Sequence, residues 1–372
     1  MPLFADILGQ SLAVTALRQA LAGDVSHAYL FTGPPGVGKS EAALAFAAGL
    51  ACRDGGCSVC DTCRRVLAGL HPDVELVVPE GAFITIEQIR EINRDVAMKP
   101  FESAVRVYVI LEAHALNVAA ANAFLKTLEE PPQHAHFILV THSPETLPQT
   151  VISRCRRVPF VRVPAVTLAD HLRSRYGVGE VDAVTFARVA QGSLRRAREL
   201  ATDPGARAQR ERLLGWVRGL GDATPADALV VLDEILGSVE KRADERVASI
   251  ETDTADRLAW APDARARARI EKLHEQRVKR ERRRAVTEGL DEVMVVFTDW
   301  HRDLAMVGLG AEETVFNHDF LYELRDQAFP GLVDRYLAAV DAIGRTRERF
   351  RYNVDARSAL EEMLFSIREA LR

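Results

Sequence analysis

One eight-residue segment restricts the fold of this chain more than any other feature. Residues 33–40 read Gly-Pro-Pro-Gly-Val-Gly-Lys-Ser and satisfy the pattern G-x-x-x-x-G-K-[ST]. An apolar run, Ala28–Thr32, precedes the segment, and apolar residues at helical spacing, Ser40–Ala51, follow it. Strand, glycine-rich loop and helix in this order are the context that a phosphate-binding P-loop requires, so the sequence predicts an α/β domain built around one.

Each residue type in the loop has a physical task. The glycines permit backbone torsions and close approach that a side chain would block, so that successive N–H groups face a phosphate. The N-terminus of the following helix adds its positive dipole end. Lys39 supplies a full charge, and the Ser40 hydroxyl is a potential Mg²⁺ ligand. We therefore expect ATP or ADP to bind, with Mg²⁺ left open, at Gly33, Pro34, Pro35, Gly36, Val37, Gly38, Lys39 and Ser40. The alternative is a loop of this type that binds nothing.

Strand and helix patterns alternate along the N-terminal region. Apolar runs at Val74–Val78, Val105–Leu111 and Phe137–Thr141 predict buried strands, and a shorter run at Arg157–Phe160 is a candidate fifth strand. Helical patterns at residues 86–97 and 117–128 fall between them. Such alternation predicts a parallel sheet with helices on both faces, over residues 1–164.

The composition changes after Pro164. Glycine-punctuated short helical stretches predict a small helical domain over residues 165–203. Residues 204–372 are helical in pattern throughout and predict a third, all-α domain, whose last helix at 353–371 carries Leu360, Met363, Leu364, Ile367 and Leu371 on one face. Residues 239–284 are dense in both charge signs, and arginines and lysines gather near Arg265, Arg267, Arg269 and Lys279–Arg284. A solvated helix face or a mobile insertion is the usual interpretation, and a DNA or partner contact is the alternative.

Four of the five cysteines lie within twelve residues, in the spacing C-x4-C-x2-C-x2-C. They are Cys52, Cys57, Cys60 and Cys63. In a chain without secretory features such a cluster favours a metal site over disulfides, and four thiolates fill a tetrahedral zinc shell completely. We therefore expect structural Zn²⁺, with free surface thiols as the alternative.

Charge and hydropathy exclude several classes of protein. No apolar run approaches the ~18 residues that a membrane span needs, and the N-terminus lacks the layout of a secretory signal. A cytoplasmic location without membrane contact is expected. The net charge of −5 argues against a globally basic nucleic-acid surface, so any DNA contact is expected to be shared with partners.

The strand predicted at 105–111 bears on hydrolysis. In P-loop ATPases an Asp usually ends this strand and holds magnesium, and a following Glu activates water. Here Leu111 stands at the Asp position and Glu112 keeps the position of the base. We therefore expect weak or absent turnover, with Glu112 as a candidate base and Ser40 as the remaining protein ligand for any Mg²⁺.

Several segments together resemble one family. His27–Gly33 leading into the P-loop, the four-cysteine insert after the first helix of the domain, Ala121–Pro132 (Ala-Asn-Ala-Phe-Leu-Lys-Thr-Leu-Glu-Glu-Pro-Pro) and Ser153-Arg-Cys155 look like bacterial clamp-loader subunits of the AAA+ class. The resemblance covers the first two hundred residues and touches residues 353–364. It implies an AAA+ domain, a helical lid and a helical collar.

The resemblance also implies roles for individual residues. Arg154 resembles the arginine finger that reaches a neighbouring subunit's ATP, a task suited to a permanently charged, bidentate guanidinium. Thr141 is similar to the residue that senses the γ-phosphate, and Arg195 looks like the second-sensor arginine of the lid. Solvent-facing, strand-end and helix-face positions are the plain structural alternatives for these three.

Within the family, Leu111 and the lack of a Tyr-Arg-Pro arm before the first helix favour the δ′ type over the motor type, τ or γ. The intact P-loop is the feature that favours the motor type of subunit. An unrelated AAA+ ATPase, such as a Holliday-junction branch-migration motor, should lack the cysteine insert. The implied partners are τ/γ and δ subunits in a hetero-pentamer of DNA polymerase III, the sliding clamp, and primer-template DNA bound through the assembly.

Overall fold

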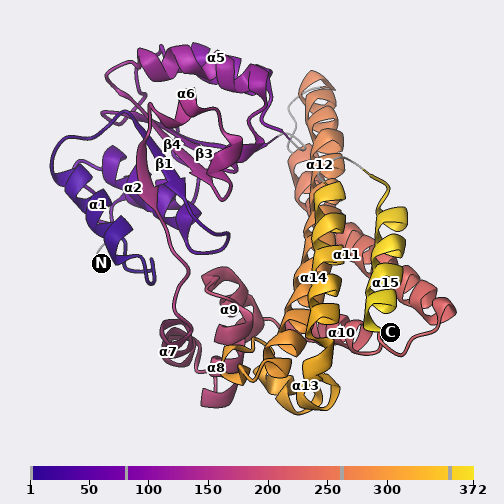
Figure 1. Ribbon diagram of the computed structural model, residues 1–372. Helices are drawn as coiled ribbons and strands as arrows, with labels where there is room; N and C mark the ends of the chain where they lie inside the picture. Colours follow the sequence, from indigo (N-terminus) through magenta and orange to yellow (C-terminus); the bar gives the residue numbers. More distant parts are fainter. Residues whose placement is uncertain (1–2, 80–82, 260–263, 351–353) are drawn as a thin grey trace. The chain divides into compact units, whose positions relative to one another are not determined.

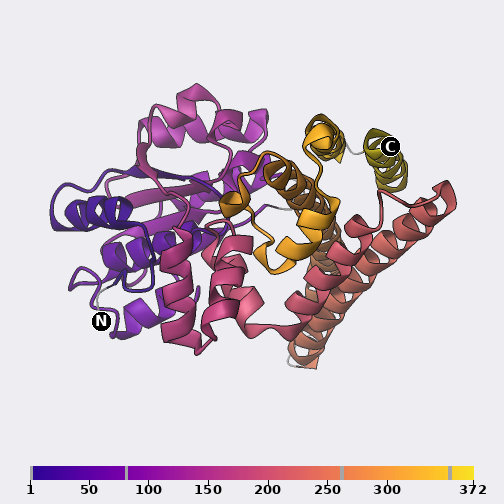
Figure 2. The ribbon, with the colours of Figure 1, turned by 60° about the horizontal axis from the view of Figure 1, so that its bottom comes forward.

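The computed structural model describes residues 3–79, 83–259, 264–350 and 354–372 (Figures 1 and 2). The chain divides into two compact units, with the boundary between Thr202 and Asp203. Among the described residues, no helix is long and apolar enough to cross a lipid bilayer.

The first unit is built on a five-stranded parallel sheet. Its strands are β1 (Ala28–Thr32), β2 (Val74–Val77), β3 (Arg106–Ile110), β4 (Ala135–Thr141) and β5 (Arg156–Pro159). They lie in the order β2-β3-β4-β1-β5, and every pairing is parallel. The four predicted strands are confirmed to within two residues at each end, and the candidate fifth strand is real and lies at the sheet edge beside β1.

Helices cover both faces of this sheet, as expected, because successive strand residues point to opposite sides. Tyr29 and Phe31 of β1 pack with helices α1 (Ser11–Ala22) and α2 (Lys39–Ala51). Ala28 and Leu30 of the same strand pack on the other face with α4 (Ile86–Asp95), α5 (Val118–Glu129) and α6 (Gln149–Ile152). Figure 1 shows α5 and α6 above the sheet and α1 and α2 below it.

The remaining helices of the first unit are short. Helix α3 (Asp61–Leu67) follows the cysteine cluster and contacts α2, and two 3₁₀ turns, η1 (Ala113–Ala115) and η2 (Pro144–Thr146), follow β3 and β4. Helices α7 (Ala165–Tyr176), α8 (Glu180–Val189) and α9 (Leu194–Thr202) enclose a small core of their own that includes Leu168, Leu172 and Ala183. A lid domain at 165–203 stays a prediction, which this separate core supports.

The second unit is entirely helical among its described residues. Its α-helices are α10 (Pro204–Arg218), α11 (Pro225–Ala259), α12 (Ala264–Gly308), α13 (Leu321–Gln327), α14 (Val333–Phe350) and α15 (Ala356–Leu371), with 3₁₀ turns η3 (Glu312–Thr314), η4 (His318–Phe320) and η5 (Pro330–Leu332). The predicted apolar face of the last helix is confirmed: Leu360, Met363, Leu364 and Ile367 are all buried. Asn353, the predicted start of that helix, lies outside the described residues.

A buried polar network ties α10, α12 and the 315–320 segment together. The guanidinium of Arg210 donates to Asp319 at 2.6 Å and to the Asn317 side chain at 2.7 Å. Asn317 in turn donates to the carboxylate of Asp303 at 2.9 Å, and Asp303 also accepts two backbone N–H bonds from the segment. Every charge in this network has a charge-assisted partner, as burial requires.

Candidate functional site: a phosphate-binding loop and a four-cysteine centre

The P-loop has the backbone that its glycines were expected to provide. Gly33, Gly36 and Gly38 have φ values of 138°, 73° and 94°, all in the region that side chains avoid. A Cβ at Gly33 would lie 2.2 Å from the backbone oxygen of Phe160, at the end of β5, so glycine is required there for space as well. The loop therefore bends sharply from β1 into the first turn of α2.

Lys39 is the first residue of α2, close to where the helix was expected to begin, and its side chain folds back over the loop. Its ammonium donates to the backbone oxygen of Gly33 at 2.6 Å and to that of Pro34. Burial lowers the pKa of Lys39 to about 8, against the opposing field of Glu41. A cation held in a buried cradle is costly by itself, and a phosphate bound beside it would offset that cost. Half-buried Ser40 follows in the same helical turn.

The end of β3 departs from an ATPase of the usual kind. Leu111 continues the strand by donating its N–H to the Val77 oxygen at 2.9 Å, and its partly buried side chain packs against the apolar core shared with α2. Glu112 then adopts left-handed backbone torsions, with φ 51° and ψ 44°. Such torsions cost a non-glycine residue ~1–3 kcal/mol and concentrate at functional sites. In P-loop ATPases this turn carries an Asp followed by a Glu. Here the turn is present, but it carries only the second carboxylate, that of Glu112.

Thr141 ends β4 at the same edge of the sheet as the P-loop. It is buried, and it lies opposite Thr32 of β1 in the sheet register. Its hydroxyl is 3.4 Å from Nδ1 of His114 and accepts the Ser143 N–H at 3.0 Å. Strand order therefore places Thr141 next to the strand that leads into the loop, as a γ-phosphate sensor requires, and that role stays a prediction.

Two histidines at this edge were missed in the sequence analysis. The rings of His114 and His142 meet edge to face, with centroids 4.0 Å apart. His114 follows β3 and His142 follows β4, so only the adjacency of these strands brings them together. No spacing in the sequence signals this contact.

The start of α9 contacts the P-loop directly. The backbone N–H of Arg195 donates to the Gly36 oxygen at 3.2 Å, and a Cβ on Gly36 would meet the Ser193 hydroxyl at 2.0 Å. The Arg195 side chain is exposed and forms an ion pair with Glu199 at 3.8 Å. The structure thus brings the backbone of Arg195 to the loop, whereas a nucleotide contact by its guanidinium stays a prediction. Ser193 is a loop neighbour that sequence reasoning missed.

Arg154 lies just after α6 and is held within its own chain. One guanidinium nitrogen contacts the carboxylate of Glu129, at the end of α5, at 2.5 Å. The other donates to the Thr150 oxygen at 2.8 Å. About a third of the side chain is exposed, so the guanidinium remains accessible from outside. Its role in a neighbouring subunit stays a prediction, and Glu129 is a partner that the sequence did not reveal.

The four predicted cysteine ligands converge. The Sγ atoms of Cys52, Cys57, Cys60 and Cys63 all lie within 4.8 Å of one another. Sγ of Cys52 is 3.9 Å from that of Cys57 and 3.7 Å from that of Cys60. A tetrahedral zinc with Zn–S of ~2.3 Å separates its sulfurs by about 3.8 Å, so the cluster has the dimensions of a zinc site.

The electrostatics of the cluster suit a cation as well. Burial raises the pKa of the Cys52 thiol, but backbone N–H groups of the Cys52–Cys57 turn more than offset this and bring the pKa to about 6. Burial raises the pKa of Cys63 above its ordinary value, which is the cost of a buried thiolate without a metal. The residues therefore fit structural zinc, and Cys52 and Cys63 anchor the cluster in the core beside α2. Cys155 is buried elsewhere in the unit.

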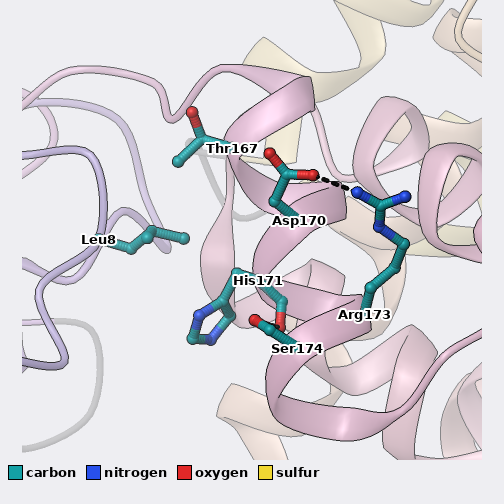
Figure 3. A pocket seen from close by; sticks show the side chains of 6 residues that line it. All are labelled: Leu8, Thr167, Asp170, His171, Arg173 and Ser174. Carbon is teal, nitrogen blue, oxygen red and sulfur yellow. Dashed lines mark hydrogen bonds and ion pairs between the residues drawn. The ribbon is translucent and has the colours of Figure 1, made fainter.

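A shallow depression between Leu8 and helix α7 is also present (Figure 3). Asp170 and Arg173 at its wall are paired with each other at 2.6 Å, and burial lowers the pKa of His171. None of the residues that line it belongs to the P-loop or the cysteine cluster, and we assign no role to it.

These features were compared with those of known proteins. Residues 9–164 match the family model described as DNA polymerase III, delta subunit. The matched residues contain the P-loop, the four cysteines and all five strands of the sheet. Similar curated proteins include DNA polymerase III subunit tau of Bacillus subtilis, 36% identical over 207 residues that span 53% of this chain and 37% of the relative. Subunit delta′ of the same organism is 39% identical over 151 residues, which span 40% of this chain and 46% of the relative.

One solved structure to which the chain is similar is that of a DNA polymerase III gamma subunit-related protein of Thermotoga maritima. It is 16% identical, with a TM-score of 0.44, and the match covers 97% of this chain and 100% of the other. The chain spans less than half the length of the two curated relatives. Tau and delta′ proteins both match, so the family is common to both subunit types.

Proposed function

We propose that this chain is a clamp-loader subunit of DNA polymerase III, of the δ′ type. In this role it binds nucleotide passively, donates Arg154 to the ATP site of a neighbouring subunit, and helps to place the sliding clamp on primed DNA. The implied partners are τ/γ and δ subunits. Exposed apolar side chains of the second unit, among them Leu309, Tyr322 and Phe329, support a collar that assembles with other subunits.

The observation that carries the δ′ assignment is Leu111. An apolar side chain packed into the core cannot ligate Mg²⁺, so Ser40 and the phosphates are left to hold the ion. In this role the loop binds nucleotide but does not hydrolyse it at a significant rate. The convergence of four thiolates counts against a branch-migration motor, which should lack this insert.

A motor subunit of the same loader is the second candidate. The observations that favour it are the intact P-loop and Glu112, which keeps the strained turn and the carboxylate of a catalytic base. A carboxylate from another position would be needed to replace the missing Asp.

Two substitutions in the reconstituted loader distinguish these candidates. The stator function predicts that Lys39→Ala leaves ATP turnover of the complex within about twofold of wild type. Arg154→Ala should reduce it by ~10³-fold, the usual effect of removing an arginine finger. Arg157→Ala, an exposed arginine three residues away, is the matched control and should have no effect.

Assembly must be measured beside turnover, by size-exclusion chromatography of each variant complex. If Lys39→Ala abolishes turnover and Arg154→Ala does not, the chain is a motor. A nucleotide titration with and without Mg²⁺ tests Leu111 directly. Affinity that depends little on Mg²⁺ supports passive binding, and a large Mg²⁺ dependence contradicts it.

A further inference from the structure

The charged stretch at 239–284 forms most of a helical hairpin. Helices α11 and α12 pack against each other along their length. Ala243 on α11 and Ala285 on α12 are the last buried residues along the hairpin among those whose side chains are described. The helices continue from there to Ala259 and from Ala264, or about 24 and 31 Å at 1.5 Å per residue. Figure 1 shows the free end of α12 running beyond the end of α14.

The charge of this hairpin is uneven. Residues 264–284 of α12 contain ten basic and three acidic residues, a net charge of +7 in a chain whose net charge is −5. The facing segment of α11, residues 239–259, contains four basic and six acidic residues, a net charge of −2. The acidic residues of α11 therefore neutralise only a minor part of the charge on α12.

Ion pairs between the two helices involve several of the described acidic residues. Arg246 of α11 contacts Glu281 at 3.1 Å and Glu288 at 2.9 Å. In the opposite sense, Arg282 of α12 contacts Asp244 at 3.1 Å. Each of these bonds links one helix to the other, and each contributes only modestly, because the side chains are 28% to 64% exposed.

The outward face of α12 is basic. His274, Val278 and Glu281 are half-buried and Ala285 is buried, which marks the face that meets α11, whereas Lys279 and Arg283 are exposed. Lys279 pairs with Glu275 at 3.2 Å, but both side chains are more than 70% exposed, so the bond is weak.

The sequence continues this pattern toward the free end of the hairpin. Basic residues recur at 265, 269, 272, 279 and 283, at intervals of 4, 3, 7 and 4 residues, which is the spacing of one helix face. No acidic residue occupies a position of this series, whose sixth place is Gln276. The side chains at 265, 269, 272 and 276 lie outside the described residues.

This distribution is unfavourable for an isolated helix. The first turn of α12 contains no acidic residue, and its basic residues gather at the positive end of the helix dipole. Like charges at i, i+4 add a further few tenths of a kcal/mol per pair. A bound polyanion would offset both the unfavourable interaction with the helix dipole and the repulsion between the basic side chains.

We propose that this basic face of α12, defined by positions 265, 269, 272, 279 and 283, binds the phosphate backbone of duplex DNA without reading its sequence. The face extends from position 265 to position 283, or about 27 Å at 1.5 Å per residue, which corresponds to about eight base pairs at 3.4 Å each. A row of charges along one face of a helix fits a stiff, regular polyanion better than a flexible acidic peptide. Residues 264–284 contain no Phe, Tyr or Trp on which single-stranded bases would stack. This inference does not depend on the proposed clamp-loader role.

The test is a salt titration of the purified full chain with a fluorescent 20-base-pair duplex, followed by anisotropy. Five phosphate contacts predict a log–log salt slope near −4.5, or about 500-fold weaker binding at 200 mM than at 50 mM salt. Replacing all five basic residues by Gln should bring the slope close to zero. The matched control replaces five exposed arginines elsewhere by Gln and should keep the slope: Arg94, Arg175, Arg198, Arg335 and Arg345.

The double variant Lys279→Gln, Arg283→Gln serves if the fivefold variant loses helicity in circular dichroism. It should make the slope shallower by about 1.8. Three results overturn the proposal: no duplex binding by the wild type at 50 mM salt, an equal loss in the control, or an unchanged slope in the variants. Tighter binding of poly-glutamate than of duplex at equal salt would assign the face to an acidic protein instead.

Discussion

Replacing Lys39 by methionine is expected to stabilise the nucleotide-free protein while it removes nucleotide binding. Burial lowers the pKa of this ammonium from 10.5 to about 8, and at 1.36 kcal/mol per pKa unit that shift corresponds to a cost of about 3 kcal/mol at neutral pH. The bonds to the Gly33 and Pro34 oxygens return about 1 kcal/mol each. The net expectation is a gain of about 1–2 kcal/mol in the free energy of unfolding for Lys39→Met.

Urea unfolding at pH 7 without nucleotide measures this gain. Exposed Lys126 on α5 provides the matched control, and Lys126→Met should change stability by less than about 0.5 kcal/mol. Nucleotide at 100 times its Kd should add about 2.7 kcal/mol to the wild type and nothing to the variant, so that the order of stability reverses.

The pH dependence gives the same reasoning a second test. A lysine whose folded pKa lies below its unfolded pKa costs free energy fully below pH 8, and that cost disappears as pH rises from 8 toward 10.5. The advantage of Lys39→Met should therefore shrink over this interval. Two results would refute the conclusion that burial of the Lys39 ammonium destabilises the protein. One is a Lys39→Met variant that is less stable than wild type at pH 7, and the other is a difference in the free energy of unfolding that grows with pH.

Three further substitutions probe the loop, the metal centre and the helical unit. Gly33→Ala places a Cβ 2.2 Å from a backbone oxygen, so it should abolish nucleotide binding and lower the free energy of unfolding by several kcal/mol. In Gly38→Ala the added Cβ meets nothing within 4 Å, so this control should lose only about 1 kcal/mol through backbone strain. Differential scanning fluorimetry of the two variants measures the difference in stability. Cys63→Ser should lower bound zinc from one atom per chain to none in elemental analysis and lower the Tm, and a chelator should do the same to the wild type. Arg210→Ala leaves the partly buried Asp319 without its cation and should cost about 3 kcal/mol in urea unfolding; a loss below 1 kcal/mol would contradict the network.

The elements that the sequence predicts well are those in which one local signal is sufficient. A buried parallel strand is a short continuous apolar run, so β1 was predicted without error and β3 to within one residue at each end. Helix α1 was missed because its apolar residues form a narrow stripe without a capping signal: its N-cap Gln10 makes no side-chain bond to the helix. The short α3 was missed because its seven residues, Asp61–Leu67, give less than two turns of helical pattern.

Site residues divide in the same way. The loop and the four cysteines lie within twelve residues of chain each, and their spacing alone specifies the geometry. The pairing of Arg154 with Glu129 and the contact of Ser193 with Gly36 join segments 25 and 157 residues apart. Such contacts depend on the order of strands in the sheet and on the path of the chain after β5, and neither is encoded locally.

The two residues after β3, Leu111 and Glu112, differ in what they contribute to a site that binds or hydrolyses nucleotide. Leu111 gains core packing where a carboxylate would hold magnesium, so its replacement by Asp would cost apolar burial as well as introduce charge. Glu112, by contrast, keeps a strained left-handed backbone that glycine would adopt at lower cost. Position 112 therefore has a strained backbone that a glycine would relieve, whereas the side chain at position 111 cannot ligate a metal. A strained turn beside Thr141 without a magnesium ligand fits a site that binds nucleotide better than it fits a site that hydrolyses nucleotide.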